Sequence, residues 1–331
     1  MASLTGFAGT LPAAGRLPGP PLRALALGAA WLALAGATYA LPEEGDFPYT
    51  VGFAGGALAL GLVLPPLTAV SARLGRAGTS LAYWTPWLTL VALGFLAWEL
   101  ITAKFALLPM PFFPPPQAIL EVFVDDWPRL GGSILASVKL LAGGYVIGAG
   151  LGFALGVAIG WSKAVGYWAH PVLRFVGPLP ATAWLPLAFF VFPSSWSAST
   201  FLIALATGFP VTVLTWSGVA GVNKAYFDVA RTLGASPAFL VLRVAVPAAL
   251  PHVFVGLFMG LGGSFAVLVV AEMLGVKAGL GWYLQWAQGW AAYANLYAAL
   301  IVMALMCSGL ITLLFALRDR VLSWQKGLVQ W

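Results

Sequence analysis

Apolar residues run along the chain in stretches of about twenty or more, separated by short polar or Gly/Pro-rich segments. A helix needs about 20 apolar residues to cross the roughly 30 Å of hydrocarbon in a bilayer. Because a single segment in lipid must satisfy its own backbone hydrogen bonds, each stretch predicts a membrane-spanning helix. Alternating apolar and polar runs, typical of transmembrane β-strands, do not occur. The chain is therefore expected to be all-α. The predicted spans are residues 22–41, 51–71, 83–103, 133–160, 176–193, 199–219, 248–274 and 293–317.

Composition supports a membrane protein and excludes other classes. Of the 331 residues, 61% are hydrophobic and 8% are charged, whereas a soluble domain carries about 25% charged residues. The single cysteine, Cys307, rules out a disulfide framework within the chain. The net charge of +6 comes from single basic residues scattered among loops, which is not the clustered basic face of a nucleic-acid-binding protein.

The basic residues also predict the orientation of the spans. With the N-terminus in the cytoplasm, 12 of the 16 Lys and Arg residues fall on the cytoplasmic side. The positive-inside rule then places both termini in the cytoplasm. The first apolar stretch, 24–41, is longer than the 7–15-residue core of a signal peptide, so an uncleaved anchor is expected. The cytoplasmic set is Arg16, Arg23, Arg73, Arg76, Lys163, Arg174, Lys224, Arg231, Arg243, Arg318, Arg320 and Lys326.

The fifth predicted span is interrupted by two prolines, Pro180 and Pro186. Proline removes a backbone hydrogen bond and kinks a helix, and broken backbone at membrane depth is tolerated where it lies within protein or faces a wet cavity. Two interpretations stay open: a segment that lines a translocation path, or a kinked packing helix. Candidate path residues here are Trp184, Pro186, Phe189 and Phe190, although the aromatic residues could equally belong to the core.

Two carboxylates, Glu99 and Glu272, lie within apolar spans. A charge at the bilayer centre costs about 3 kcal/mol on insertion scales, so both are expected near the outer ends of their spans and close to a partner. Lys104 is the expected neighbour of Glu99. Glu272 either pairs with Lys277 or faces the translocation path, and we include it among the candidate path residues.

The connector at residues 221–247 predicts two short helices. Asn223 can cap the first, Gly234 can break it with positive φ, and Ser236 and Pro237 can begin the second. Amphipathic helices of this kind either dock a partner or lie on the membrane surface.

The chain offers no candidate catalytic or metal site. His170 and His252 are far apart, and no group of Cys, His, Asp or Glu has the spacing of metal ligands. There is no Gly-x-x-x-x-Gly-Lys-[Ser/Thr] phosphate loop, so nucleotide binding by that route is not expected.

Several ordered motifs resemble a known family. Asp228-x-Ala230-x-x-x-Gly234-Ala235, followed by Val246-Pro247 and Leu250-Pro251, resembles the cytoplasmic "EAA" loop of binding-protein-dependent ABC importer permeases. Further motifs are similar to the nitrate/sulfonate/taurine subfamily, and together they cover about residues 84–331. They are Trp98-Glu-Leu100, Leu107–Ala118, Pro178–Pro186, Val270–Gly275 and Gly279–Tyr283. The chain departs from the usual loop at Asp228, where the family has Glu, and at Val229, where it has Ala.

The resemblance implies a type I ABC importer permease core of six spans in residues 81–331, with residues 1–80 adding a cytoplasmic lead and two further spans. It implies a multi-pass protein of the bacterial inner membrane and a homodimer. The implied partners are two ATP-binding cassette subunits that hold ATP and Mg, an extracytoplasmic substrate-binding protein and membrane lipid, with no cofactor in this chain and no nucleic acid. The implied ATPase-coupling residues are Asp228, Ala230, Arg231, Gly234, Ala235, Ser236, Pro237, Pro247 and Pro251.

The subfamily handles small organic or inorganic anions and some vitamin precursors, so a small anionic solute is the expected substrate. The main alternative is a secondary transporter driven by an ion gradient, for which Glu99 and Glu272 are the candidate coupling acids. A membrane scaffold without transport activity would explain the hydrophobicity but not the loop motif.

Overall fold

A computed structural model describes residues 20–43, 45–70 and 75–325, and these residues form helices without any strand. Three residues of the charge count, Arg16, Arg73 and Lys326, lie outside the described residues. The chain divides into two compact units, one up to Asp125 and one from Asp126 onward. The predicted division at residues 80 and 81 concerns the family core rather than packing, and it stays a prediction.

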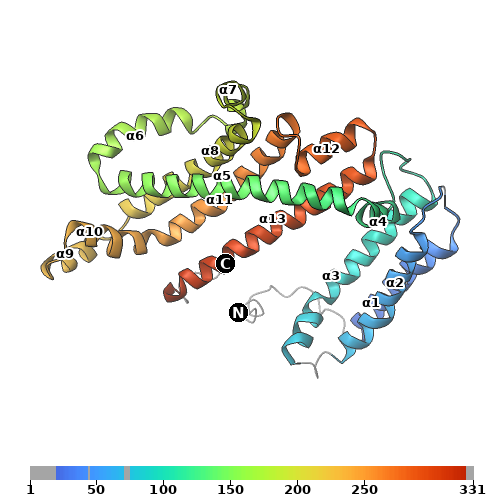
Figure 1. Cartoon of the computed structure of the whole chain (residues 1–331). Coiled ribbons are helices and arrows are strands. Elements are labelled where there is room, and N and C mark those ends of the chain that lie inside the picture. Colours follow the sequence, from blue (N-terminus) through green and yellow to red (C-terminus); the bar gives the residue numbers. More distant parts are fainter. Residues whose placement is uncertain (1–19, 44, 71–74, 326–331) are drawn as a thin grey trace. The chain divides into compact units, whose positions relative to one another are not determined.

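In the part of the first unit that the structure describes, the helices are α1, α2, α3 and α4 (Figure 1). Side chains of α1, α2 and α3 form a buried cluster that includes Leu27, Leu34, Ala57 and Ala92. A π-helical turn, Leu100–Lys104, continues α3. The short helix expected after the proline-rich segment is confirmed as α4. The bounds are α1 Pro20–Ala40, α2 Thr50–Ala69, α3 Gly75–Glu99 and α4 Pro116–Asp125.

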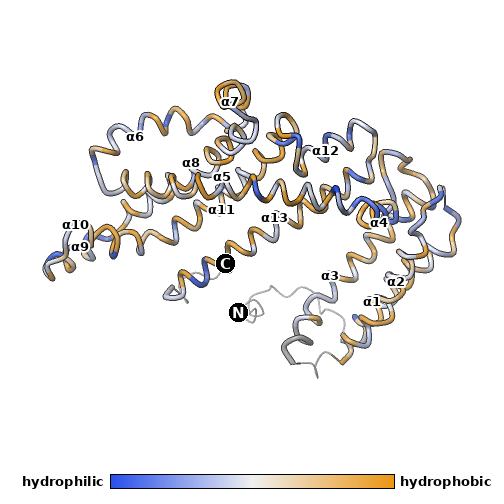
Figure 2. Tube along the Cα trace, in the orientation of Figure 1, coloured by the Kyte–Doolittle hydropathy of each residue, from blue (hydrophilic) through white to orange (hydrophobic). Residues whose placement is uncertain are grey.

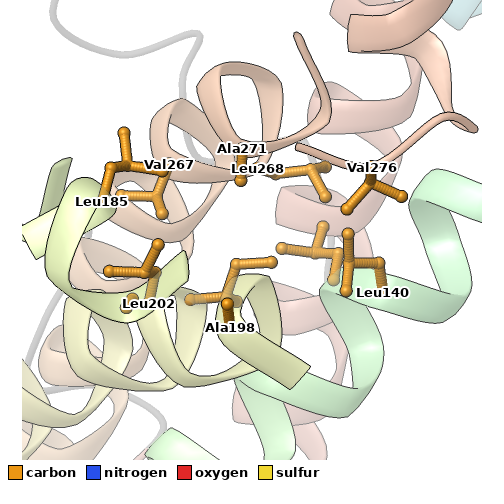
Figure 3. Packing of buried hydrophobic residues seen from close by; sticks show 11 residues of the cluster. Leu140, Leu185, Ala198, Leu202, Val267, Leu268, Ala271 and Val276 are labelled. Atoms are coloured by element: carbon orange, nitrogen blue, oxygen red, sulfur yellow. The ribbon is translucent and has the colours of Figure 1, made fainter. Parts of the chain in front are cut away.

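The second unit is built around three long helices, α5, α8 and α11, which lie side by side (Figure 1). Their inner faces and α7 share a hydrophobic cluster, in which Leu140, Leu185, Leu202 and Leu268 point toward one another (Figure 3). The bounds are α5 Trp127–Trp161, α6 Lys163–Val176, α7 Leu185–Val191, α8 Ser195–Ala220, α9 Lys224–Thr232, α10 Pro237–Phe239, α11 Val246–Leu274, α12 Leu280–Gly289 and α13 Tyr293–Val321.

A row of glycines lets α5 approach α8 closely. A Cβ added at any of these glycines would press on a backbone carbonyl of α8. From each glycine in the row to the next, the carbonyl that it meets lies four residues further along α8. The partners of Gly144 and Gly160 are the carbonyls of Thr200 and Trp216, so the two helices run parallel in one register. Small residues at every fourth position allow such close helix contacts in lipid. The row is Gly144, Gly148, Gly152, Gly156 and Gly160.

The predicted spans are confirmed except for the fifth. Seven helices are long and apolar enough to cross a membrane, and the number rises to eight if one bent pair counts as a span. In Figure 2 the long helices are largely hydrophobic. The bent pair consists of α6 and residues 181–191, which meet at a bend of 87°. Because α5 and α8 run parallel, the chain between them must return across their length, which makes the bent pair one crossing.

The predicted interruption of this span is confirmed, but the predicted bounds, 176–193, miss its first half, because the bent pair begins at Lys163. The helix α6 ends at Val176, a 3-10 turn follows at Ala181–Trp184, and α7 has only seven residues. Pro178 and Pro180 lack the N–H groups that would carry α6 onward, and each disfavours helical backbone in the residue before it.

Candidate functional site

The connector between α8 and α11 begins with a well-formed helix, α9. The Asn223 side chain caps it by accepting a hydrogen bond from the backbone N–H of Ala225 at 3.0 Å, as predicted. Gly234 has a φ of +80°, which confirms the predicted break. The Ala235 N–H donates to the Ala230 carbonyl at 3.0 Å and the Gly234 N–H to that of Arg231 at 2.9 Å. These two bonds form a Schellman motif, which stops the helix and turns the chain sharply.

The second half of the connector differs from the prediction. Ser236 caps the next helix by accepting from the Phe239 N–H at 3.3 Å, and Pro237 occupies its first turn, as expected. This helix is not a separate short element, because a π-helical segment at Leu240–Ala245 carries it directly into α11. Pro247 has no N–H group to donate to the carbonyl four residues back. The π-helical segment, with its wider i to i+5 hydrogen bonds, therefore ends just before Pro247 without the loss of a backbone hydrogen bond at that position.

One side of the connector is fixed to the long helices. The Phe227 ring meets the Trp161 ring edge to face at 5.8 Å, and it also packs on a cluster of Val219, Ala245 and Ala249. The helix α9 is thus held at the end of α5 and α8, and any force on it acts on those helices.

The other side of the connector is open. Tyr226, Val229 and Leu233 are exposed, with 83% of the Leu233 surface accessible. Asp228 and Arg231 form a surface pair at 3.4 Å. A folded, capped helix that presents apolar side chains beside one ion pair is suited to sit in a groove of a partner protein. The connector around α9 and α10 also contains hydrophilic residues (Figure 2).

A cavity of about 290 Å³ lies at the break after α6. The walls come from the broken segment, α8 and α11, and include Gly177, Thr182, Phe209 and Gly263. The five candidate path residues are not among its lining. Trp184 and Phe189 pack against the hydrophobic cluster of Figure 3.

The remaining candidate path residues also lie away from this cavity wall. Pro186 is exposed on α7, and the Phe190 side chain is 86% accessible. Their assignment to a translocation path stays a prediction.

Glu272 is buried and bonded within the second unit. Its carboxylate accepts from the Ser137 hydroxyl at 2.7 Å and from the Gly281 N–H at 2.8 Å. The Ser137 oxygen in turn accepts from the Leu280 N–H at 2.8 Å. Glu272 makes no ion pair with Lys277, although both residues are described. The carboxylate therefore joins the end of α11 and the start of α12 to α5.

Glu99 lies beside Lys104 as predicted, with 3.7 Å between the carboxylate and the ammonium group. The Gln117 amide also donates to Glu99, at 3.2 Å. Lys104 is buried and donates to the Thr38 carbonyl at 2.8 Å and to Glu43 at 3.2 Å. The N-terminal helix α1 is thereby tied to α3 by a buried cation, a contact that span prediction alone does not reveal.

A polar cluster joins α12 to the start of α5 and α13. The Tyr283 hydroxyl donates to Asp126 at 2.6 Å, and the Asn295 amide donates to both. Burial raises the pKa of Tyr283, which keeps the phenol protonated as a donor. Arg129 lies over the Trp286 ring, 4.5 Å from its centre.

Comparison with known proteins gives a consistent set of similarities. The sequence profile of the family described as "Binding-protein-dependent transport system inner membrane component" matches residues 144–325. A probable ABC transporter permease protein of Brucella abortus is 32% identical over 71% of this chain and 93% of its own length.

Two further relatives have more specific names. A putative aliphatic sulfonates transport permease of Bacillus subtilis is 29% identical over 79% of this chain and 95% of its own length. A nitrate import permease of Synechococcus elongatus is 30% identical over 64% of this chain and 75% of its own length.

Proposed function

The chain belongs to the family of binding-protein-dependent transport system inner membrane components, and from this premise we propose that it imports a small anion with the work of a separate ATPase. It is a multi-pass ABC permease of the inner membrane. In the described residues, seven long apolar helices and one bent pair are candidates for its spans.

The connector geometry is the observation that carries the proposed coupling. The helix α9 and the turn at Gly234 present exposed apolar side chains outward, while Phe227 fixes them to Trp161 at the end of α5. An ATPase that moved this surface would move α5, α8 and α11 with it. The change between two arrangements of the spans would then be driven by the free energy of ATP.

Most of the proposed coupling residues belong to the connector, and two lie further along the chain in α11. Asp228, Arg231, Gly234 and Pro237 are exposed, and the turn that holds them is closed by backbone hydrogen bonds. Ala230 and Ala235 are small, which keeps the surface low enough for a groove. Ser236 caps the following helix, and Pro247 and Pro251 lie in the first two turns of α11.

The names of the relatives support an anionic substrate. Nitrate and aliphatic sulfonates are the solutes named for two of them, and both solutes carry negative charge. We extend this class to the present chain as part of the proposal. The partners proposed with it are a second copy of the chain, two ATP-binding subunits and an extracytoplasmic binding protein. ATP and Mg would be bound by the ATP-binding subunits.

The proposed orientation places both termini and the α9 connector in the cytoplasm. The charge distribution supports it, because the loops on that side carry most of the Lys and Arg residues. The ion-gradient-driven alternative is not favoured. Glu99 and Glu272, its candidate coupling acids, are buried and hydrogen-bonded to Gln117 and Ser137.

Replacing Gly234 with valine tests the coupling. The β-branched residue must adopt φ near +80°, and left-handed backbone costs about 1–2 kcal/mol for a residue with a Cβ. We expect solute uptake per ATP hydrolysed to fall by roughly fivefold, which corresponds to about 1 kcal/mol lost from the docked turn. The measurement is uptake and ATP hydrolysis by the full complex, with binding protein, in proteoliposomes.

Gly234→Asn is the matched control, because asparagine tolerates left-handed backbone better than other residues with a Cβ. It should retain most of the coupling. If the valine variant assembles normally and transports as well as the wild type, the turn does not transmit the work of the ATPase.

A further inference from the structure

The cavity at the helix break lies near the middle of a membrane-spanning helix. Ala206 of α8 forms part of its wall. This residue lies eleven positions after the start of α8 at Ser195 and fourteen before its end at Ala220. At 1.5 Å per residue these separations are about 17 and 21 Å. Because α8 is long and apolar enough to cross a bilayer, the cavity lies at a depth where lipid chains or protein would normally surround it.

The broken backbone in the cavity wall argues against lipid chains as its occupant. Gly177, Leu179 and Pro180 line the cavity, and they lie between the last residue of α6 and the 3-10 turn at Ala181–Trp184. Backbone outside a helix does not face lipid chains at this depth, because its polar groups would have no partner there; it is buried in protein or lines a water-filled cavity. Since this break lines a cavity, the cavity holds water or a solute.

The other walls are apolar and carry no charge. Leu205, Phe209 and Val267 contribute hydrocarbon from α8 and α11, and every described residue that lines the cavity is uncharged. A bare inorganic anion would lose its hydration here without gaining a charged partner, which is costly. The apolar part of an organic anion is favoured in the same surroundings. The Thr182 hydroxyl is the polar side-chain group of the wall.

The size of the cavity also fits an organic solute. Its volume is about 290 Å³, whereas one water molecule takes about 30 Å³ in the liquid. A small inorganic anion would leave most of this space unfilled, and a short hydrocarbon chain would fill it. Gly263 keeps part of the space free, because a Cβ added there would have the Ala206 carbonyl oxygen, at 3.6 Å, as its one neighbour within 4 Å.

We propose that this cavity selects organic anions with an apolar tail, of which alkanesulfonates are the simplest, over inorganic anions. The tail packs against the α8 and α11 walls at Phe209, Val267 and Gly263. The charged head group stays in water beside the break, where it accepts a hydrogen bond from the Thr182 hydroxyl. This inference rests on the proposed function, because it narrows the class of anion that the permease carries.

Protection of a cysteine from modification tests the occupant without requiring transport. Cys307→Ser removes the native cysteine, and Ala266→Cys supplies a reporter in the cavity wall. The permease with its ATPase subunits, in phosphatidylethanolamine and phosphatidylglycerol nanodiscs, is treated with a methanethiosulfonate reagent. Nitrate or unbranched alkanesulfonates of two to five carbons are present at constant ionic strength. The half-protecting concentration should fall about fourfold for each added methylene group, as burial of that group predicts, and nitrate should not protect.

Leucine variants at adjacent positions provide the matched control. Gly263→Leu should weaken protection by pentanesulfonate at least tenfold, because its side chain takes the space of the tail. Gly262→Leu should leave protection unchanged, since position 262 is outside the wall and an added Cβ there meets no atom within 4 Å. Thr182→Val removes the hydroxyl that binds the shared head group. It should weaken protection by every alkanesulfonate by a similar factor of roughly ten.

The possible results separate this inference from the proposed function. Equal protection by nitrate, no dependence on chain length, or equal effects of the two leucine variants overturns the selectivity. No labelling at position 266 also overturns it, because lipid chains or a second copy of the chain then cover the wall. The chain-length series needs no leucine variant, so it decides even if Gly263→Leu does not fold. Selective protection in a complex that shows no ATP-driven uptake of any anion supports the site and contradicts the proposed function.

Discussion

Gly148→Leu is expected to prevent the second unit from folding. A Cβ at position 148 would overlap the Ala204 carbonyl oxygen, and its other neighbours are the Ala204 backbone and Thr207. A backbone carbonyl in a helix cannot turn aside, unlike the end of a flexible side chain. Inserting extra methylene groups into a packed interior costs about 1–3 kcal/mol, and a whole leucine side chain between two backbones should exceed that range. The yield of monodisperse protein after solubilisation measures the effect.

The same helix provides the control for this prediction. Gly150 lies two residues further along α5, is exposed, and has no atom within 4 Å of an added Cβ. Gly150→Leu should give protein with nearly the wild-type yield and melting temperature, and Gly148→Ala should fall between the two. Equal yields for the two leucine variants would show that α5 and α8 are not in the register described.

Glu272→Ala is expected to have the second largest effect on stability. The substitution leaves the Ser137 hydroxyl and the Gly281 N–H buried without their acceptor. Each buried unsatisfied group costs about 1–3 kcal/mol, so a loss of roughly 3 kcal/mol or more is expected. Thermal unfolding of the purified protein measures it. Glu272→Gln keeps one carbonyl acceptor and should lose less.

A double-mutant cycle with Ser137→Ala sharpens the prediction. Because the two side chains touch at 2.7 Å, the double variant should lose less stability than the sum of the single variants.

Glu272→Gln also tests the ion-gradient-driven alternative. An acid that coupled transport to a proton gradient would, in Glu272→Gln, abolish uptake while leaving stability unchanged. We expect Glu272→Gln to reduce stability more than it reduces uptake.

The positions of the spans were predictable because each span depends on the composition of its own residues. An apolar stretch must satisfy its backbone wherever it packs, so seven helices followed from length and hydropathy. The capping of α9 by Asn223 and the positive φ of Gly234 were predictable for the same reason, since both are properties of a few adjacent residues. The path of the chain through residues 176–193 was not predictable, because hydropathy alone does not show in which direction a chain turns after a proline.

Contacts between distant segments were predicted less well. The glycines of α5 are visible in the sequence at every fourth position, but only their register against α8 reveals that they face a backbone. Glu272 finds Ser137, which is 135 residues away, in preference to nearby Lys277. The expectation that Glu99 lies near Lys104 succeeded because the two are one helical turn or so apart. Glu43 and Thr38, which complete that cluster, come from a separate helix and its following loop.

Site-specific cross-linking from Leu233 tests the central claim most directly. This side chain is 83% exposed on the turn after α9, so it should touch whatever docks there. A photo-crosslinking amino acid at position 233, in the complex assembled in its native membrane, should form an adduct with the ATPase subunit. The same group at position 305, exposed on the long apolar helix α13, should not. Adducts from position 233 that contain only lipid, with none to an ATPase, would contradict the account.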